Sequence, residues 1–260
     1  MAEMTGYSDG VPCWVDLGTP NVGRAKDFYT ALFGWDYIDT GEESGHYQLA
    51  VLKGKTVAGI MEQQPDWPAQ SAWMTYLWTD DADGTAKKIR DAGGALLMEP
   101  TDVMDQGRMA IANDPAGALF GLWQGRAHLG SGLANEPGAF TWNDNLSTDP
   151  LAAREFYGHV FGYEYEVVAD PSDPTSEYAM IKVDGRPVGG IAGQPSFIPA
   201  GTPSYWNTYF SVDDADDAAR RAEQGGGAVV LPAAPAPYGR QAVVRDNAGA
   251  LMVLVASGEG

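Results

Sequence analysis

The chain has 260 residues, 44% of them hydrophobic and 11% aromatic, so it can build cores of ordinary size, and its length predicts about two domains. Its 35 Asp and Glu outnumber 16 Lys and Arg and give a formal net charge of -19. Nucleic acid and anionic membranes need positive charge opposite them, so neither is an expected partner. A lone cysteine, Cys13, and the lack of a signal-like N-terminus or a long apolar run predict a cytoplasmic protein.

An internal repeat dominates the sequence. Residues Trp14 to Tyr37 read WVDLGTPNVGRAKDFYTALFGWDY, and Trp142 to Tyr165 read WNDNLSTDPLAAREFYGHVFGYEY, an ungapped pair with eight identities. Chance would give about one or two. Later segments repeat as well: SYWNTYFSVDDADDAA answers SAWMTYLWTDDADGTA, and GRQAVVRDNAGALMVLVA answers GRMAIANDPAGALFGLWQ. The chain is therefore a duplication of one unit of about half its length.

The first half begins with an alternating, β-rich stretch near residues 11–18 that predicts a strand. Asn21 then begins a helix with apolar positions at three- and four-residue spacing, and Gly34 ends it. Three short strands follow, in WDYID, HYQLAVLKG and KTVAGIME. After a Pro-rich spacer the order recurs: the strand AWMTYLWT, a helix that Asp80 or Asp81 begins, then strands in ALLMEP, GRMAIAND and GALFGLWQ.

Each half thus predicts two modules of the order strand, helix, strand, strand, strand. The fold class is α+β, with four βαβββ modules in all. We expect one half over residues 1–124, a Gly-rich connector over 125–138, and the second half over 139–260.

Three motifs carry a family resemblance: AKDFYTALFGW on the first helix, VDDADDAARRAEQGGG on a later helix, and the closing hairpin of Gly-Arg, strand, Asp-x-x-Gly, strand. Together they resemble the vicinal oxygen chelate superfamily, which includes glyoxalase I, extradiol dioxygenases and bleomycin resistance proteins. Within it the chain is most similar to the fused, two-half glyoxalase-like proteins of actinobacteria, some of them labelled hydroxylases. The resemblance covers nearly the whole chain and implies paired modules that form two curled, half-open β-sheets around cavities, with helices outside.

The resemblance also implies where a metal would bind. Metal-dependent members place His or Gln on the first strand of a module and Glu on its last strand, around one divalent ion. In this chain, the strand that would carry the remaining metal ligand reads VAGIM in the first half and VGGIA in the second. Indole, thioether, glycine and valine cannot hold a hard cation, so neither a metal nor another cofactor is expected. The matching positions are Trp14, Met74 and Gly121 in the first half and Trp142, Asn207 and Val253 in the second.

Other reactive side chains offer no alternative site. His46, His128 and His159 have no paired metal-binding spacing, and each is expected to be a surface or capping residue. Cys13 has no His near it in sequence, and its alternation points it away from the cavity, which predicts a buried structural thiol.

Strand side chains alternate, so residues two and four positions from the metal-ligand positions also face the cavities. Side chains of the opposite parity, such as Val15, Leu77, Phe120 and Leu122, are expected to pack under the helices. An aromatic-lined hollow with few polar groups is typical of a small-molecule site. The alternative is that the rings fill the hollow as core. The cavity-facing sets are Trp14, Asp16, Met74, Tyr76, Trp78, Leu119, Gly121 and Trp123, and then Trp142, Asp144, Tyr205, Asn207, Tyr209, Ser211, Leu251, Val253 and Val255.

Asp16 and Asp144 stand at the same place in the two halves. Burial beside indole rings should raise their pKa values, which makes them candidate catalytic acids or bases. The alternative is structural, a hydrogen bond to strand backbone or an ion pair with Arg108 or Arg240, which begin the penultimate strands. Those arginines are also candidate ligand-binding residues, because they could hold an anionic or phenolate group.

These observations favour a metal-independent protein that binds an aromatic or largely apolar metabolite, for sequestration or antibiotic resistance. A second hypothesis is an enzyme of secondary metabolism, such as an isomerase, cyclase, lyase or tailoring enzyme, in which Asp16 or Asp144 moves a proton. A third is a metal-dependent glyoxalase-type lyase with displaced ligands, and a fourth is a closed, purely structural pair of cavities. The fused halves are expected to form a monomer or a homodimer.

Overall fold

A computed structural model describes residues 3–63, 71–170 and 173–256. The elements of the first half are β1 (Pro12–Thr19), α1 (Val22–Phe33), β2 (Asp36–Asp39), the short 3-10 turn η1 (Glu42–Ser44), β3 (Gln48–Leu52), β4 (Lys55–Glu62), β5 (Ala72–Trp78), α2 (Ala82–Asp91), β6 (Ala95–Val103), β7 (Gly107–Asn113) and β8 (Leu119–Gly125). Those of the second half are β9 (Phe140–Ser147), α3 (Pro150–Phe161), β10 (Glu164–Asp170), β11 (Asp173–Val183), β12 (Arg186–Gly193), β13 (Tyr205–Ser211), α4 (Ala215–Gln224), β14 (Ala228–Ala236), β15 (Gly239–Arg245) and β16 (Leu251–Ala256).

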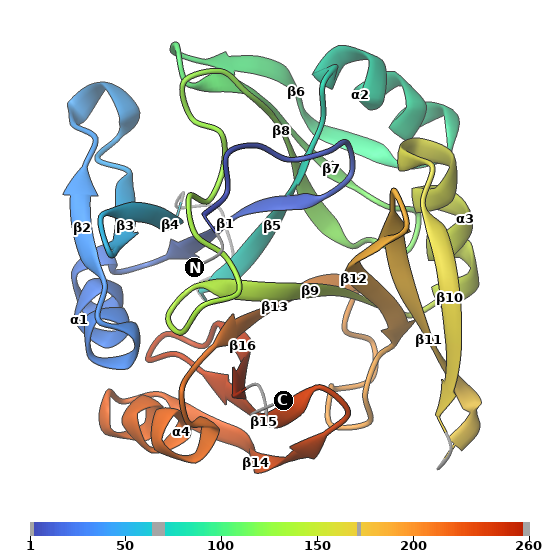
Figure 1. Ribbon diagram of the computed structural model, residues 1–260. Helices are drawn as coiled ribbons and strands as arrows, with labels where there is room; N and C mark the ends of the chain where they lie inside the picture. The colour runs from blue at the N-terminus through green and yellow to red at the C-terminus, as the bar shows by residue number, and fades with distance from the viewer. Residues whose placement is uncertain (1–2, 64–70, 171–172, 257–260) are drawn as a thin grey trace.

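The strands form two eight-stranded sheets with the same order. The first runs β2-β3-β4-β1-β5-β8-β7-β6, and the second runs β10-β11-β12-β9-β13-β16-β15-β14 (Figure 1). In each sheet the first strand of one module pairs antiparallel with the first strand of the next, as β1 does with β5 and β9 with β13. The α+β class and the repeated module order are therefore confirmed.

The helix boundaries follow the capping residues of the sequence. The side chain of Asn21 accepts a hydrogen bond from the amide of Arg24 at the start of α1, and Gly34 ends the helix with a φ of 73°. Asp81, one of the two predicted residues, caps α2 in the same way through the amide of Gly84. No helix in the described ranges is long and apolar enough to span a membrane.

The two halves share their hydrophobic cores. One core joins Phe28 and Tyr29 of α1 to Ala218 of α4, and another joins Ile89 of α2 to Phe156 of α3. Figure 1 accordingly shows α1 beside α4 and α2 beside α3. The helix-covered sides of both sheets are therefore buried where the two halves pack together. The opposite sides are left for the cavity-facing residues.

Two buried carboxylates hold these shared cores together. Asp114, in the turn before β8, accepts hydrogen bonds from Tyr157 of α3 at 3.2 Å and from Asn145 of β9 at 3.2 Å. At the equivalent turn, Asp246 accepts a hydrogen bond from Tyr29 of α1 at 3.0 Å. Each half thus contributes one acidic turn that binds a helix tyrosine of the other half.

Candidate functional site

From Trp14 onward, the alternation of β1 separates the two faces of the first sheet as predicted. Val15 and Leu17 are fully buried in the core under α1, whereas Trp14 belongs to a different cluster on the other face. That cluster also contains Tyr76, Trp78 and Trp123, with Met74 packed against it. The aromatic residues that the repeat placed in the first cavity therefore do lie together.

Asp16 is the polar centre of this face. Its Oδ2 accepts hydrogen bonds from the hydroxyl of Tyr76 at 2.9 Å and from the hydroxyl of Tyr47 at 3.3 Å. The Tyr47 hydroxyl in turn accepts one from the indole Nε1 of Trp14 at 2.9 Å. The carboxylate of Asp16, which is 3% exposed, is thus held by two phenols, one of which accepts a hydrogen bond from an indole, rather than by a cation.

The second half repeats this network. Oδ1 of Asp144 accepts hydrogen bonds from the hydroxyl of Tyr178 at 2.8 Å and from Nε1 of Trp142 at 2.9 Å. The same indole also donates to the Tyr178 hydroxyl at 2.8 Å, and Tyr209 contributes a further hydrogen bond to the carboxylate. We call each set of four side chains the Trp-Tyr-Asp-Tyr network.

Burial governs the acidity of both carboxyl groups. It raises the pKa of Asp16 to about 7, and the hydrogen bonds from Tyr76 and Tyr47 offset only part of this effect. Burial likewise raises the pKa of Asp144 against the hydrogen bonds from Tyr209, Tyr178 and Trp142. A carboxyl group that titrates near neutral pH can act as an acid or as a base.

Tyr47 and Tyr178 were not among the residues expected in the cavities. Their place in the repeat was nevertheless readable: HYQLAVLKGKTVAGIM aligns with EYAMIKVDGRPVGGIA, in which the tyrosines and two glycines coincide. One of these glycines, Gly59 on β4, lies opposite Asp16 in the sheet. A Cβ there would lie 1.7 Å from the Tyr47 hydroxyl oxygen, and a Cβ on Gly190 would lie 2.1 Å from that of Tyr178. Glycine therefore makes room for each phenol.

The residues present do not fit a divalent cation. Where members of the resembled family place ligands, the first half has Trp14, whose nitrogen donates to Tyr47, and Gly121. A Cβ on Gly121 would lie 2.1 Å from the Tyr76 ring, so a tyrosine ring occupies the space of that side chain. No group of three or more His, Cys, Asp and Glu within the described ranges could hold a metal ion.

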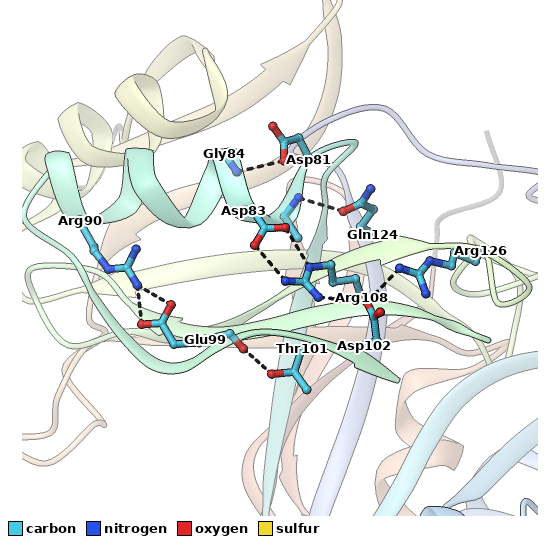
Figure 2. Close-up of polar contacts among 11 residues, drawn as sticks. Asp81, Asp83, Gly84, Arg90, Glu99, Thr101, Asp102, Arg108, Gln124 and Arg126 are labelled. Atoms are coloured by element: carbon cyan, nitrogen blue, oxygen red, sulfur yellow. Dashed lines mark hydrogen bonds and ion pairs between the residues drawn. The ribbon is translucent and has the colours of Figure 1, made fainter. Parts of the chain in front are cut away.

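The two arginines take different partners from those expected. Figure 2 shows Arg108 between Asp83 of α2 and Asp102 of β6, with Nε and Nη2 bound to Asp83 at 2.9 Å and Nη1 bound to Asp102 at 3.0 Å. Arg240 is bound to Asp216 of α4. Both therefore lie on the helix side of their sheets, because each occupies a strand position of core parity. The ion pairs with Asp16 and Asp144 are not formed, so that alternative was wrong.

The connector contributes a side chain that was expected at the surface. The ring of His128 packs edge-on against Trp14, with 4.5 Å between ring centroids, and also against Trp123 at 5.5 Å. Burial lowers the pKa of His128 to about 4, so the imidazole is neutral at physiological pH. His46, in contrast, is exposed beside Asp39, as expected.

The lone thiol is structural. Cys13 is fully buried and its Sγ lies 3.5 Å from the carbonyl oxygen of Tyr76. The expectation that it points away from the cavity was wrong: it packs in the same cluster as Trp14, at the place where the pairing of β1 with β5 shifts register. Burial raises its pKa, which disfavours the reactive thiolate.

Comparison with known proteins gives a family and relatives over the whole length. A model of the Glyoxalase/Bleomycin resistance protein/Dioxygenase superfamily matches residues 13–122 and 146–254. The chain is 39% identical over 259 residues to "Putative glyoxylase CFP32" of Mycobacterium tuberculosis, covering 96% of each chain. It is 34% identical over 271 residues to "Anthracycline biosynthesis protein DnrV" of Streptomyces peucetius, covering 99% of this chain and 97% of that protein.

Solved structures share the fold at low identity. The Mn(II)-bound glyoxalase of Novosphingobium aromaticivorans has a TM-score of 0.65 at 15% identity, over 95% of this chain and 82% of that one. The 2,3-dioxygenase LapB of Pseudomonas sp. KL28 has a TM-score of 0.66 at 12% identity, over 96% and 93%. These likenesses concern the fold alone.

Proposed function

Because the chain belongs to the Glyoxalase/Bleomycin resistance protein/Dioxygenase superfamily, we propose that it is a metal-independent member that binds an aromatic or largely apolar small molecule. The observation that carries this proposal is the Trp-Tyr-Asp-Tyr network in each half, which stands where metal ligands would lie. Neutral donors around one carboxylate give a polar anchor within an aromatic surface, and this combination suits a planar organic ligand.

The relatives support a role in secondary metabolism. Those from Streptomyces are named anthracycline biosynthesis proteins. The chain aligns with these relatives over more than nine-tenths of its length, and it is therefore proposed to act on, or to sequester, a metabolite of an antibiotic pathway.

Native mass spectrometry of the freshly purified protein, compared with its denatured mass, tests metal independence. We expect no retained divalent ion after dialysis against Mn(II) followed by metal-free buffer, because the donor set lacks oxygen and nitrogen ligands with open geometry. We also expect an organic adduct, or uptake of a planar neutral aromatic on titration. Retention of one divalent ion per half would contradict the proposal and favour the metal-dependent lyase.

A second candidate function is an enzyme that uses the same carboxyl groups. It is favoured by the pKa of Asp16, which burial raises to about 7. Asp16→Asn or Asp144→Asn, whichever lies in the half that binds the substrate, is expected to abolish turnover of any molecule that co-purifies, while its Kd changes by less than about threefold, because amides accept the tyrosine hydrogen bonds but do not titrate. Turnover and Kd measured on the same preparations check this. Equal loss of both, or of neither, would count against proton transfer.

A further inference from the structure

The two sheet faces that carry the Trp-Tyr-Asp-Tyr networks differ in how completely their side chains are buried. In the first half, Trp14 is 4%, Trp123 7% and Trp78 8% exposed. Their indole N–H groups all donate within the chain: Trp14 to Tyr47, Trp78 to Asp80 at 2.8 Å, and Trp123 to the carbonyl of His128 at 2.9 Å. This face has the packing of a core.

Two segments outside the sheet cover the first face. Figure 1 shows the N-terminal segment and the connector crossing in front of the first sheet. The ring of Tyr7 stacks on Trp78 with 6.2 Å between centroids, and its hydroxyl donates to the carbonyl of Ser131 at 2.8 Å. His128 packs against Trp14 from the same connector. The unpartnered Nε2 of His128 belongs to a ring that itself fills the face.

The second face carries polar side chains at the matching places. Asn207 replaces Met74 and Ser211 replaces Trp78 on β13. On β15, Gln241 replaces Met109, and Ala242 beside it is fully buried in the core. Trp142, Tyr178, Tyr205 and Tyr209, which are aromatic residues of this face, are only half-buried.

Two polar atoms on this face are buried without a partner. Asn207 is 5% exposed, and its Oδ1 accepts no hydrogen bond from the residues described. Within the same part of the chain, the buried hydroxyl of Tyr205 also has no hydrogen-bond partner. Buried polar groups in native proteins are nearly always satisfied, so each of these atoms is open to a partner other than the described residues.

We propose that the ligand binds on the face of the second sheet that carries the network, against Trp142, Tyr205 and Tyr209, and donates an O–H or N–H hydrogen bond to Oδ1 of Asn207. The first half is a filled copy that supports the fold. This inference rests on the proposed function and assigns it to one half. The ligand is a planar ring with a donor substituent and no negative charge, because Asp144 and the net charge of -19 repel anions.

Two fluorescent compounds, β-naphthol and its methyl ether, test the assignment to the second half. They differ in that only β-naphthol has a hydroxyl group that can donate a hydrogen bond. Isothermal titration should give one β-naphthol per chain, and the methyl ether should bind about tenfold more weakly, as expected for one lost hydrogen bond to a buried acceptor. Asn207→Leu should weaken β-naphthol about tenfold and leave the methyl ether within about twofold. Met74→Leu, the same replacement at the equivalent site of the first half, should change neither affinity.

A second matched pair addresses the ring contacts. Trp142→Phe should weaken β-naphthol severalfold, and Trp14→Phe should leave it unchanged, with urea unfolding used to confirm that both variants are folded. No saturable binding of β-naphthol to the native chain would overturn the proposed function itself. Two molecules per chain, equal effects of Trp14→Phe and Trp142→Phe, or an unchanged affinity in Asn207→Leu would overturn only the assignment to the second half.

Discussion

Asp114→Ala is expected to lower the free energy of unfolding by about 3–5 kcal/mol, because it removes a buried acceptor that several donors share. Oδ1 of Asp114 accepts from the amides of Ala116 and Ala118 at 2.9 Å, and Oδ2 accepts from Tyr157 and Asn145. Alanine would leave these groups buried without partners at the junction of the two halves. Urea unfolding followed by circular dichroism measures the loss.

Two controls separate this effect from a general sensitivity to mutation. Asp114→Asn keeps one side-chain oxygen for the turn amides and should cost less than half as much. Asp246→Ala, at the equivalent turn, should cost about as much as Asp114→Ala, because Asp246 accepts from Ala248, Ala250 and Tyr29. A loss below about 1 kcal/mol in Asp114→Ala would show that the junction does not depend on this carboxylate.

Asp16→Asn is expected to remove part of the pH dependence of stability. Burial raises the pKa of Asp16 from 3.8 to about 7, so the folded chain binds this proton more tightly than the unfolded chain. The resulting stabilisation is fully present below about pH 4 and is lost as the pH rises through 7, by up to about 4 kcal/mol. The native chain should therefore be less stable at pH 8 than at pH 5, and the variant should show a flatter dependence.

The measurement is the free energy of unfolding in urea from pH 4 to pH 9 for both proteins. Asparagine still offers an oxygen to the Tyr47 and Tyr76 hydroxyls, so the network can persist. Glu155→Gln, which removes an exposed carboxylate from α3, is the matched control. An identical slope in Asp16→Asn and the native chain would mean that Asp16 does not titrate in this range.

Much of the fold is determined by local sequence. Asn21 and Gly34 set the ends of α1 through capping, which depends on a few adjacent residues. Strand alternation assigned Val15 to the core and Trp14 to the opposite face, because a strand has only two sides. The ungapped repeat then carried each assignment from one half to the equivalent position of the other.

What the sequence could not determine was which side chains meet across the sheet and between segments. Tyr47 reaches Asp16 only because β3, β4 and β1 are neighbours and Gly59 leaves space between them. His128 packs on Trp14 because the connector returns over the first sheet, a path that no local pattern specifies.

Arg108 shows the same division between local and tertiary information. The sequence correctly placed Arg108 at the start of the penultimate strand of its module, but the distance of Arg108 from Asp16 depends on which face of the sheet each side chain occupies. Asp83 on α2 competes for the guanidinium at 2.9 Å, and helix and strand are brought together only in the folded chain. The repeat by itself determined the modules, the caps and the faces. Tertiary structure decided the partners, because hydrogen bonds and ion pairs depend on distances between residues far apart in sequence.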